Sequence, residues 1–200
     1  IGLRTLIEYN VFPISKAIVI KEDQEKVFEY VRNVYAYLYP NGHCKIYNPL
    51  SVNKRFRYFG NTNAQDIFGI DPILNFNKQY GKTFLICICA GQKDCMSLYY
   101  NAGIRAVSFN SETQIPTLEQ YELIRDIADH VVVLYDNDKT GLSAANKLRT
   151  EYALPVLNIS NFTDVNDIAD YFISGGTHQL LHKQIFSLIK SNGYVRWQIK

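Results

Sequence analysis

The fold of this chain is decided by the stretch Val131-Val132-Val133-Leu134-Tyr135-Asp136-Asn137-Asp138-Lys139-Thr140-Gly141. Five apolar or β-forming residues open it, and they predict a strand buried on both faces, as in the middle of a parallel sheet. The strand ends in Asp136 and Asp138, and a helical pattern begins at Leu142. Ligands bind at the carboxyl ends of strands in open α/β sheets, and two carboxylates there can share a hard cation. A solvated turn accounts for the same residues equally well, because Asp, Asn and Gly are common turn residues.

Strand and helix patterns alternate regularly on both sides of this stretch. Further strands are predicted at residues 83–89, 104–109 and 155–159, and helices at 92–102, 117–129, 142–152, 166–172 and 178–189. Strands separated by helices of this length specify a parallel sheet with right-handed crossovers. We therefore expect an α/β domain at residues 83–176, followed by a C-terminal helix and tail at 177–200.

The first 82 residues predict a smaller α+β unit. Apolar residues recur at helical spacing over residues 22–38, and strands are predicted at 17–20, 44–47 and 55–59. Residues 61–80 are rich in Asn, Asp and Pro and are predicted to be irregular, with a domain boundary at Gly81-Lys82. Residues 1–82 carry 11 Lys and Arg against 7 Asp and Glu, whereas residues 83–176 carry 6 against 12. A basic front beside an acidic middle suits a polyanion binder with a cation site, although unequal solvated surfaces give the same division.

A cluster of basic side chains lies in the second half of this front unit. Arg55 and Arg57 alternate with aromatic residues on a predicted strand, which places both guanidinium groups on one strand face. Lys45 and Lys54 lie nearby in the sequence, so the four form a candidate phosphate-contacting surface. The polar outer face of an antiparallel sheet is the alternative.

Cysteine usage and hydropathy exclude several classes of protein. The four cysteines include no Cys-x-x-Cys pair and have no histidine at finger-like spacing, so no zinc is expected. Free cysteines in an apolar strand favour a reducing, cytoplasmic setting. No apolar run reaches membrane-spanning length and no signal peptide is visible, so no membrane partner is expected. The chain begins at Ile1 rather than Met, which fits a piece of a longer protein.

Three polar clusters follow strands of the predicted sheet, at residues 90–94, 136–138 and 163–167. A parallel sheet brings such strand ends to one edge, where unpaired carboxylates repel one another unless a cation is present. Each cluster could instead be a helix start, since Asp94 suits the positive end of a helix dipole and Asp164 suits an N-cap. All three together favour a cation site.

The order of these turns resembles the TOPRIM domain of bacterial and phage primases and type IA topoisomerases. Residues 88–94 are similar to its Glu-Gly-x-x-Asp turn and residues 134–141 to its Asp-x-Asp-x-x-Gly turn, and residues 83–176 cover nearly all of the domain. Residues 44–60 resemble the basic subdomain that precedes TOPRIM in primases, most of all in primase-type proteins of phages and mobile elements of the Bacteroides group. A topoisomerase also needs a nucleophilic tyrosine domain, for which this chain has no room. The resemblance therefore implies a primase.

A primase implies template-directed synthesis of RNA primers on single-stranded DNA during replication, from ribonucleotides and with Mg²⁺ or Mn²⁺. The resemblance assigns catalysis to Asp136, Asp138 and Asp94, and metal binding to Asp136, Asp138 and Asp164. It assigns contacts with nucleic-acid or nucleotide phosphates to Lys45, Lys54, Arg55, Arg57, Lys93 and Lys139. A fused or associated helicase is an expected partner.

One departure from the family pattern limits this interpretation. Ala90 stands where the family has its glutamate, and Gln92 occupies the place two residues on, where some relatives carry one. Asp94, Asp164 and Glu112 are the acids that could replace it. A TOPRIM domain that binds metal and nucleic acid without catalysis is therefore an alternative.

A second alternative is a haloacid-dehalogenase-type phosphatase. Residues 134–140 also fit the Asp-x-Asp-x-Thr signature of that family, in which Asp136 would be the covalent nucleophile and Asp138 the general acid. That family carries the motif on its first strand, whereas here it follows the third strand of the predicted domain.

Overall fold

The computed structural model describes residues 1–22, 24–40, 42–60 and 66–192. They form two compact units, Gly2–Asp66 and Ile67–Lys200, the latter including the described residues up to 192. The observed division thus precedes the predicted boundary at residue 82, because residues Ile70–Tyr80 form a helix, α2, that packs on the sheet of the second unit. The prediction that residues 61–80 are irregular is wrong from residue 70 onward, and residues 61–65 lie outside the described part. Pro72 does not prevent the helix because it lies in the first turn, where no helical N–H donor is lost.

The second unit is built on a three-stranded parallel sheet, which confirms the predicted α/β class. Its strand order is β8 (Arg105–Val107), β7 (Thr83–Cys89) and β9 (Ala128–Leu134). The strand predicted at residues 155–159 is wrong. That segment makes a single parallel bridge between Val156 and Val133, because Pro155 has no N–H to donate and only the bonds from Val133 N to Pro155 O and Leu157 N to Val133 O form, both 2.9 Å long.

The remaining helices of this unit follow the sequence pattern closely. They are α3 (Gln92–Ala102), α4 (Leu118–Asp126), α5 (Lys139–Tyr152), α6 (Ile168–Ile173) and α7 (His178–Ser191), with a short 3₁₀ turn at Ile159–Asn161. A capping box opens α4, as predicted, because Thr117 and Gln120 exchange side-chain and backbone hydrogen bonds. Within the described parts of the chain, no helix combines the length and apolar character needed to cross a membrane.

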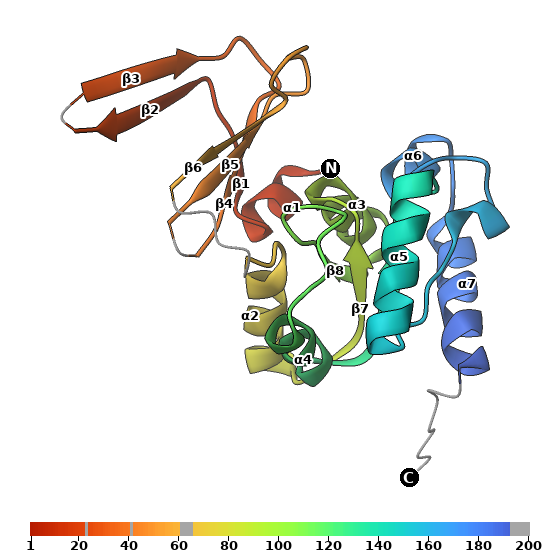
Figure 1. The fold of residues 1–200 in the computed structure, drawn as a ribbon. Coiled ribbons are helices and arrows are strands. Elements are labelled where there is room, and N and C mark those ends of the chain that lie inside the picture. Colours follow the sequence, from red (N-terminus) through yellow and green to blue (C-terminus); the bar gives the residue numbers. More distant parts are fainter. Residues whose placement is uncertain (23, 41, 61–65, 193–200) are drawn as a thin grey trace. The chain divides into compact units, whose positions relative to one another are not determined.

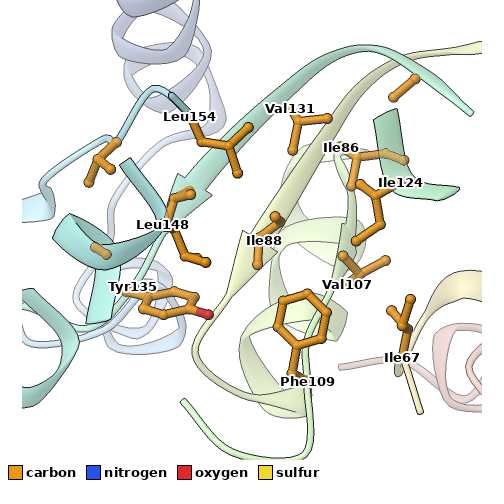
Figure 2. Packing of buried hydrophobic residues seen from close by; sticks show 14 of the residues in the cluster. Ile67, Ile86, Ile88, Val107, Phe109, Ile124, Val131, Tyr135, Leu148 and Leu154 are labelled. Atoms are coloured by element: carbon orange, nitrogen blue, oxygen red, sulfur yellow. The ribbon is translucent and has the colours of Figure 1, made fainter. Parts of the chain in front are cut away.

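Helices cover both faces of the sheet (Figure 1). Ile86 and Ile88 of β7 point to one face, where α2, α4 and α5 contribute to a single core cluster that includes Leu148 (Figure 2). Cys89 points to the other face because strand side chains alternate. Its thiol contacts Cys95 of α3, and α6 and α7 pack against that helix. The carboxyl ends of β7 and β9 are thus held between two helical layers.

We expect the first of these layers to be essential for stability. Leu148 of α5 is 1% exposed in the core cluster, so Leu148→Ala should lower the free energy of unfolding by about 2–5 kcal/mol. Leu118→Ala is the matched control, because Leu118 is 61% exposed and the same deletion should change stability by less than about 0.5 kcal/mol. Urea unfolding followed by circular dichroism measures both. Equal losses for the two variants would contradict the assigned core.

The first unit begins with a short helix, α1 (Leu3–Glu8), and contains two antiparallel sheets. One has the order β1 (Val11–Pro13), β4 (Tyr35–Leu38), β5 (Cys44–Tyr47) and β6 (Phe56–Phe59), and the other pairs β2 (Lys16–Lys21) with β3 (Gln24–Glu29). Figure 1 shows the β2–β3 ribbon extending beyond the four-stranded sheet of this unit. A small apolar cluster that includes Val34, Ala36 and Ile46 lies on one face of that sheet.

The helix predicted at residues 22–38 is wrong, and β3 and β4 occupy that stretch. Glu22 and Asn33 have φ of 51° and 57°, which are left-handed values that an α-helix excludes. Val31 is 98% exposed, so the valines at helical spacing do not form one buried stripe. Antiparallel pairing of β3 with β2, the strand directly before it, outweighs the helical spacing of the apolar residues, because strand formation depends on cross-strand partners as well as on local pattern.

Candidate functional site

The paired carboxylates lie just beyond the end of β9. Asp136 is half-buried, and Asp138 is the exposed N-cap of α5. The Oδ1 atom of Asp138 accepts hydrogen bonds from the backbone N–H groups of Thr140 and Gly141, each 2.8 Å long. This cap starts α5 at Lys139, three residues before the predicted start. The ordinary-turn interpretation is therefore correct for one oxygen of Asp138, and Oδ2 is the atom left for another partner.

The other two polar clusters come to the same edge of the sheet, as predicted. The backbone N–H of Asn137 donates to the carbonyl oxygen of Asn166 over 2.7 Å, which joins the second cluster to the third. Burial and the nearby charges of Asp167 and Asp138 raise the pKa of Asp136 to about 6. Burial and Asp167 raise the pKa of Asp94 to about 8, and Asp136 adds to this effect. The carboxylates are thus close enough to disfavour one another's charged forms.

Asp94 is the most enclosed of these acids. It lies in the first turn of α3 with 6% of its surface exposed, and its carboxylate accepts a hydrogen bond from the backbone N–H of Ala169. Its Oδ1 atom is buried without a hydrogen-bond partner among the described residues. A buried carboxylate oxygen without a donor is unfavourable, which is the condition that a cation would relieve.

Asp167, rather than Asp164, represents the third cluster at this edge. Its Oδ1 caps α6 by accepting from the N–H of Asp170 over 2.7 Å, and its Oδ2 lies 3.0 Å from Nζ of Lys93. Asp164 is exposed and is not among the charges that raise the pKa of Asp136. The sequence held a signal for Asp167, because an Asp directly before the apolar pair 168–169 suits an N-cap.

Lys93 is held within the acidic cluster. Burial lowers its pKa, but its hydrogen bond to Asp167 and the charge of Asp94 outweigh burial and leave the pKa raised. Lys139 is exposed at the first position of α5, where the helix dipole disfavours a positive charge. The two predicted phosphate contacts of this unit therefore differ, since Lys93 is paired with Asp167 and Lys139 is exposed to solvent.

Glu112 also reaches the paired carboxylates. It lies in the loop after β8, and burial together with the charges of Asp136 and Asp138 raises its pKa to about 7. A Cβ added to Gly141 would lie 2.7 Å from Oε1 of Glu112 and 2.3 Å from the carbonyl oxygen of Asp136. The glycine of the Asp-x-Asp-x-x-Gly turn is therefore required by close approach, because any side chain would collide with both.

The basic residues predicted in the first unit do not share one surface. Lys45 pairs with Tyr58 and Ile46 pairs with Arg57 across β5 and β6, so Lys45 and Arg57 point to opposite faces of the sheet. The Nζ of Lys45 lies 4.4 Å from the ring centre of Phe56, and burial lowers its pKa to about 8.

The other three arginine and lysine side chains of this group also differ in their surroundings. The guanidinium of Arg57 lies 4.9 Å from the ring centre of Phe28. Lys54 and Arg55 are exposed in the loop that leads into β6. The pair Lys54 and Arg55 is thus the part of the predicted phosphate surface that faces solvent.

Comparison with protein families identifies the domain that carries the turn with Asp136 and Asp138. Residues 85–163 match the model of the Toprim domain family. This range contains most of β7, all of β9 and the turn at Asp136–Gly141. This part of the chain is a Toprim domain. A comparison with the sequences of curated proteins finds no match.

The fold surrounding this Toprim domain is that of primase catalytic cores. A DnaG catalytic core superposes with a TM-score of 0.70 at 11% identity, covering 93% of this chain and 69% of that chain. A chain from a bacteriophage T7 lagging-strand DNA polymerase structure with gp4 primase domains gives 0.59 at 14% identity, covering 93% and 87%. A DnaG catalytic domain bound to single-stranded DNA gives 0.59 at 15%, covering 92% and 60%. These likenesses establish the fold, and the predicted phage or mobile-element origin stays a prediction.

The Toprim carboxylates fit a hard cation with few protein ligands. Within the described residues, no group of three or more His, Cys, Asp or Glu side chains is arranged to hold a metal ion. Mg²⁺ commonly uses one or two carboxylates and keeps several waters, so Asp136 with Oδ2 of Asp138 is a sufficient set. The raised pKa values of the surrounding acids and the orphaned oxygen of Asp94 are consistent with this fit.

The pKa shifts predict how pH and Mg²⁺ affect stability. Asp136, Glu112 and Asp94 keep their protons to about pH 6, 7 and 8 in the folded chain, above the ordinary range of carboxyl groups. The folded chain therefore binds more protons than the unfolded chain, and these groups lower the free energy of unfolding as pH rises from about 4 to 8. We expect Mg²⁺ to raise the melting temperature more at about pH 8 than at about pH 5.

Calorimetry with chelator and with Mg²⁺ tests this expectation. Asp136→Asn should reduce both the pH dependence and the response to Mg²⁺, whereas Asp129→Asn, an exposed acid at the start of β9, should change neither. An equal Mg²⁺ effect at both pH values would contradict the assigned site.

Proposed function

We propose that this chain is the catalytic part of a DNA primase, which joins ribonucleotides into an RNA primer on single-stranded DNA with Mg²⁺ or Mn²⁺. The observation that carries this proposal is the position of Asp136 and Asp138 at the strand end of a Toprim domain. The likeness to primase cores extends over 93% of the chain and so includes the unit that precedes this domain. One of those cores is described with single-stranded DNA bound.

The residues of the Toprim domain suit the positioning of phosphates. Asp136 and Asp138 would hold the cation, which supplies charge neutralisation at the nucleotide phosphates when bound. Lys139 stands beside them at the N-terminus of α5, where its charge and the positive end of the helix dipole both attract an anion. Asp167 pairs with Lys93 next to the same acids, so the ammonium group of Lys93 also lies within the acidic cluster.

Lys54 and Arg55 would contact phosphates of the template. Their side chains are exposed, and such contacts to single strands depend on salt rather than on base sequence. Lys45 and Arg57 are packed on aromatic rings, so we assign them a smaller part in this surface, although both stay predicted nucleic-acid contacts. A fused or associated helicase stays a predicted partner.

A Toprim domain that binds metal and nucleic acid without catalysis is the second candidate. The observation in its favour is Ala90, which removes an acid from the end of β7. The phosphatase alternative has less support, because the matching family is Toprim and the motif follows β9, the third strand of the second unit rather than its first.

A priming assay distinguishes the two candidates. With single-stranded template, labelled ribonucleotides and Mn²⁺, we expect short RNA products from the wild-type chain. Asp136→Asn with Asp138→Asn should abolish them because the cation is lost, and asparagine keeps the N-cap of α5 intact. Asp129→Asn should leave the products unchanged.

Absence of primers from the wild-type chain, together with retained DNA binding, would overturn the primase proposal in favour of the binding module. Release of phosphate from an aryl phosphate would instead favour the phosphatase.

Binding of single-stranded DNA tests the basic residues. Lys54→Ala with Arg55→Ala should weaken binding and lower the slope of log K against log salt by about 1.4, at about 0.7 per lost phosphate contact. Lys183→Ala with Lys190→Ala removes two exposed charges from α7 and is the matched control. Fluorescence anisotropy over a range of salt concentrations measures both. An unchanged slope in the first variant would assign Lys54 and Arg55 to a solvated surface.

A further inference from the structure

One face of the four-stranded sheet in the first unit carries a group of aromatic side chains around a lysine. Tyr47 lies directly opposite Phe56 across β5 and β6. Lys45 lies opposite Tyr58 in the same pair of strands. Directly paired residues share a face of a sheet, as do residues two apart on one strand, so these four side chains lie together. Because β6 ends the strand order, Phe56 and Tyr58 lie at the edge of this face.

This face passes from buried to exposed as it approaches β6. Tyr37 of β4, which lies opposite Lys45, is 4% exposed, and Lys45 is also buried. Phe56 and Tyr58 are each 47% exposed. Phe59, which alternates with Tyr58 and points to the opposite face, packs instead against the small apolar cluster of the unit. That cluster therefore does not account for the two exposed rings.

Contacts with neighbouring side chains hold these two rings in place. The ring of Tyr47 stacks on that of Phe56, with 5.0 Å between the ring centres and 18° between the ring planes. The Nζ atom of Lys45 lies 4.4 Å from the ring centre of Phe56 and 5.7 Å from that of Tyr58. Ring faces attract an ammonium group at such distances. The exposed rings are thus pre-organised beside a positive charge, which lowers the entropy cost of binding a ligand.

Two exposed basic residues stand directly before the rings. Lys54 and Arg55 precede Phe56 in the loop that joins β5 to β6. This loop is compact, because the N–H of Asn48 donates to the carbonyl oxygen of Arg55 over 2.7 Å and the N–H of Lys54 donates to Oγ of Ser51 over 3.3 Å. Basic residues beside exposed aromatic rings are the combination that binds single-stranded nucleic acids, with phosphates on the cations and bases on the rings. The charges favour such a polyanion over an apolar protein segment.

The spacing of the rings suits an extended single strand. Residues two apart on an antiparallel strand, such as Phe56 and Tyr58, lie about 6.8 Å apart. This is roughly twice the rise of about 3.4 Å per nucleotide in a stacked strand of DNA. Unpaired bases can be splayed apart and stacked on aromatic side chains, whereas the bases of a duplex are already stacked on one another. The ring pair therefore favours single strands.

We propose that Phe56 and Tyr58 form a stacking site for unpaired bases of a DNA single strand whose phosphates contact Lys54 and Arg55. The identity of this strand as a primase template rests on the proposed function, whereas the site for its bases does not. Because every base has an aromatic face, the site would hold a strand without selecting its sequence. Binding at this unit then has two parts, a salt-dependent part from the phosphates and a salt-independent part from the bases.

Binding of single-stranded oligodeoxynucleotides, followed by fluorescence anisotropy without ribonucleotides, tests the proposal. Phe56→Leu with Tyr58→Leu removes both rings and should weaken binding about fivefold or more. The slope of log K against log salt should stay that of the wild type, because no phosphate contact is lost. Tyr58→Phe keeps the ring and should bind as the wild type does. Tyr100→Leu removes an exposed tyrosine from α3 and is the matched control, with unchanged binding expected.

A strand of abasic nucleotides separates stacking from other effects of the substitutions. It keeps the phosphates and lacks the bases, so the wild type and the variant without rings should bind it equally. An equal loss on the abasic and the base-bearing strand would overturn the proposal, and so would unchanged binding of the base-bearing strand by the variant without rings. Circular dichroism of each variant shows whether the fold is retained.

Photo-crosslinking tests the same contact in the unaltered chain. With 5-iododeoxyuridine in the strand, mass spectrometry should locate crosslinks at Phe56 or Tyr58, and crosslinks found only at other residues would overturn the stacking site. Base-dependent binding by a chain that makes no primers would uphold the stacking site and reject the primase. Primers from a wild-type chain whose variant without rings binds the strand as tightly would uphold the primase and reject the stacking site.

Discussion

Repulsion among carboxylates at the ends of β7 and β9 is the constraint on which the site depends. Asp136, Asp138, Asp167 and Asp94 converge there because a parallel sheet directs its strand ends to one edge. Folding brings like charges together. The ammonium group of Lys93 and the N-cap hydrogen bonds of Asp138 and Asp167 offset this repulsion in part, and the raised pKa values of Asp94 and Asp136 reflect the rest. Parallel pairing of β7 with β8 and β9 fixes the register of these strands, and helices cover both faces of the sheet. A bound divalent cation would convert the repulsion into a source of stability and position phosphates at the same place.

Local sequence patterns were sufficient for most of the Toprim domain. The bounds of β7 and α3 agree with the prediction residue by residue, because apolar strands followed by capped helices are encoded by neighbouring residues. The Asp136–Gly141 turn is likewise a local motif, and so its place at a strand end was predictable. The same reasoning failed over residues 22–38, where β3 pairs with β2. Val27 and Val31 are exposed there, whereas Val34 is buried in the apolar cluster of the first unit. Pairing between strands overrides a helical pattern. Because β3 is largely exposed on both faces, its sequence also lacks the apolar and polar alternation that marks a half-buried strand.

The composition of the site was only partly predictable for a similar reason. The sequence offered Asp94, Asp164 and Glu112 as replacements for a missing glutamate, and nothing in the spacing distinguishes among them. Which acid lies near the pair depends on how each loop folds, and the loop after β8 places Oε1 of Glu112 2.7 Å from the position of a Cβ on Gly141. Asp164 was preferred for its place in an acidic loop, but the cap of α6 selects Asp167. Lys45 and Lys93 show that a basic residue near a motif can already be engaged within the fold.

The double use of Asp138 couples the cation site to the helix behind it. One carboxylate oxygen of Asp138 caps α5, and the other is left for a ligand. Helix capping and ligand binding therefore use the same carboxylate group. Anything that orders the first turn of α5 also fixes the orientation of the ligand oxygen, and by reciprocity a bound cation orders that turn. Leu148, three turns further along, ties α5 to the core. A cation bound at Asp138 would therefore stabilise the first turn of a helix that is anchored in the core of the domain.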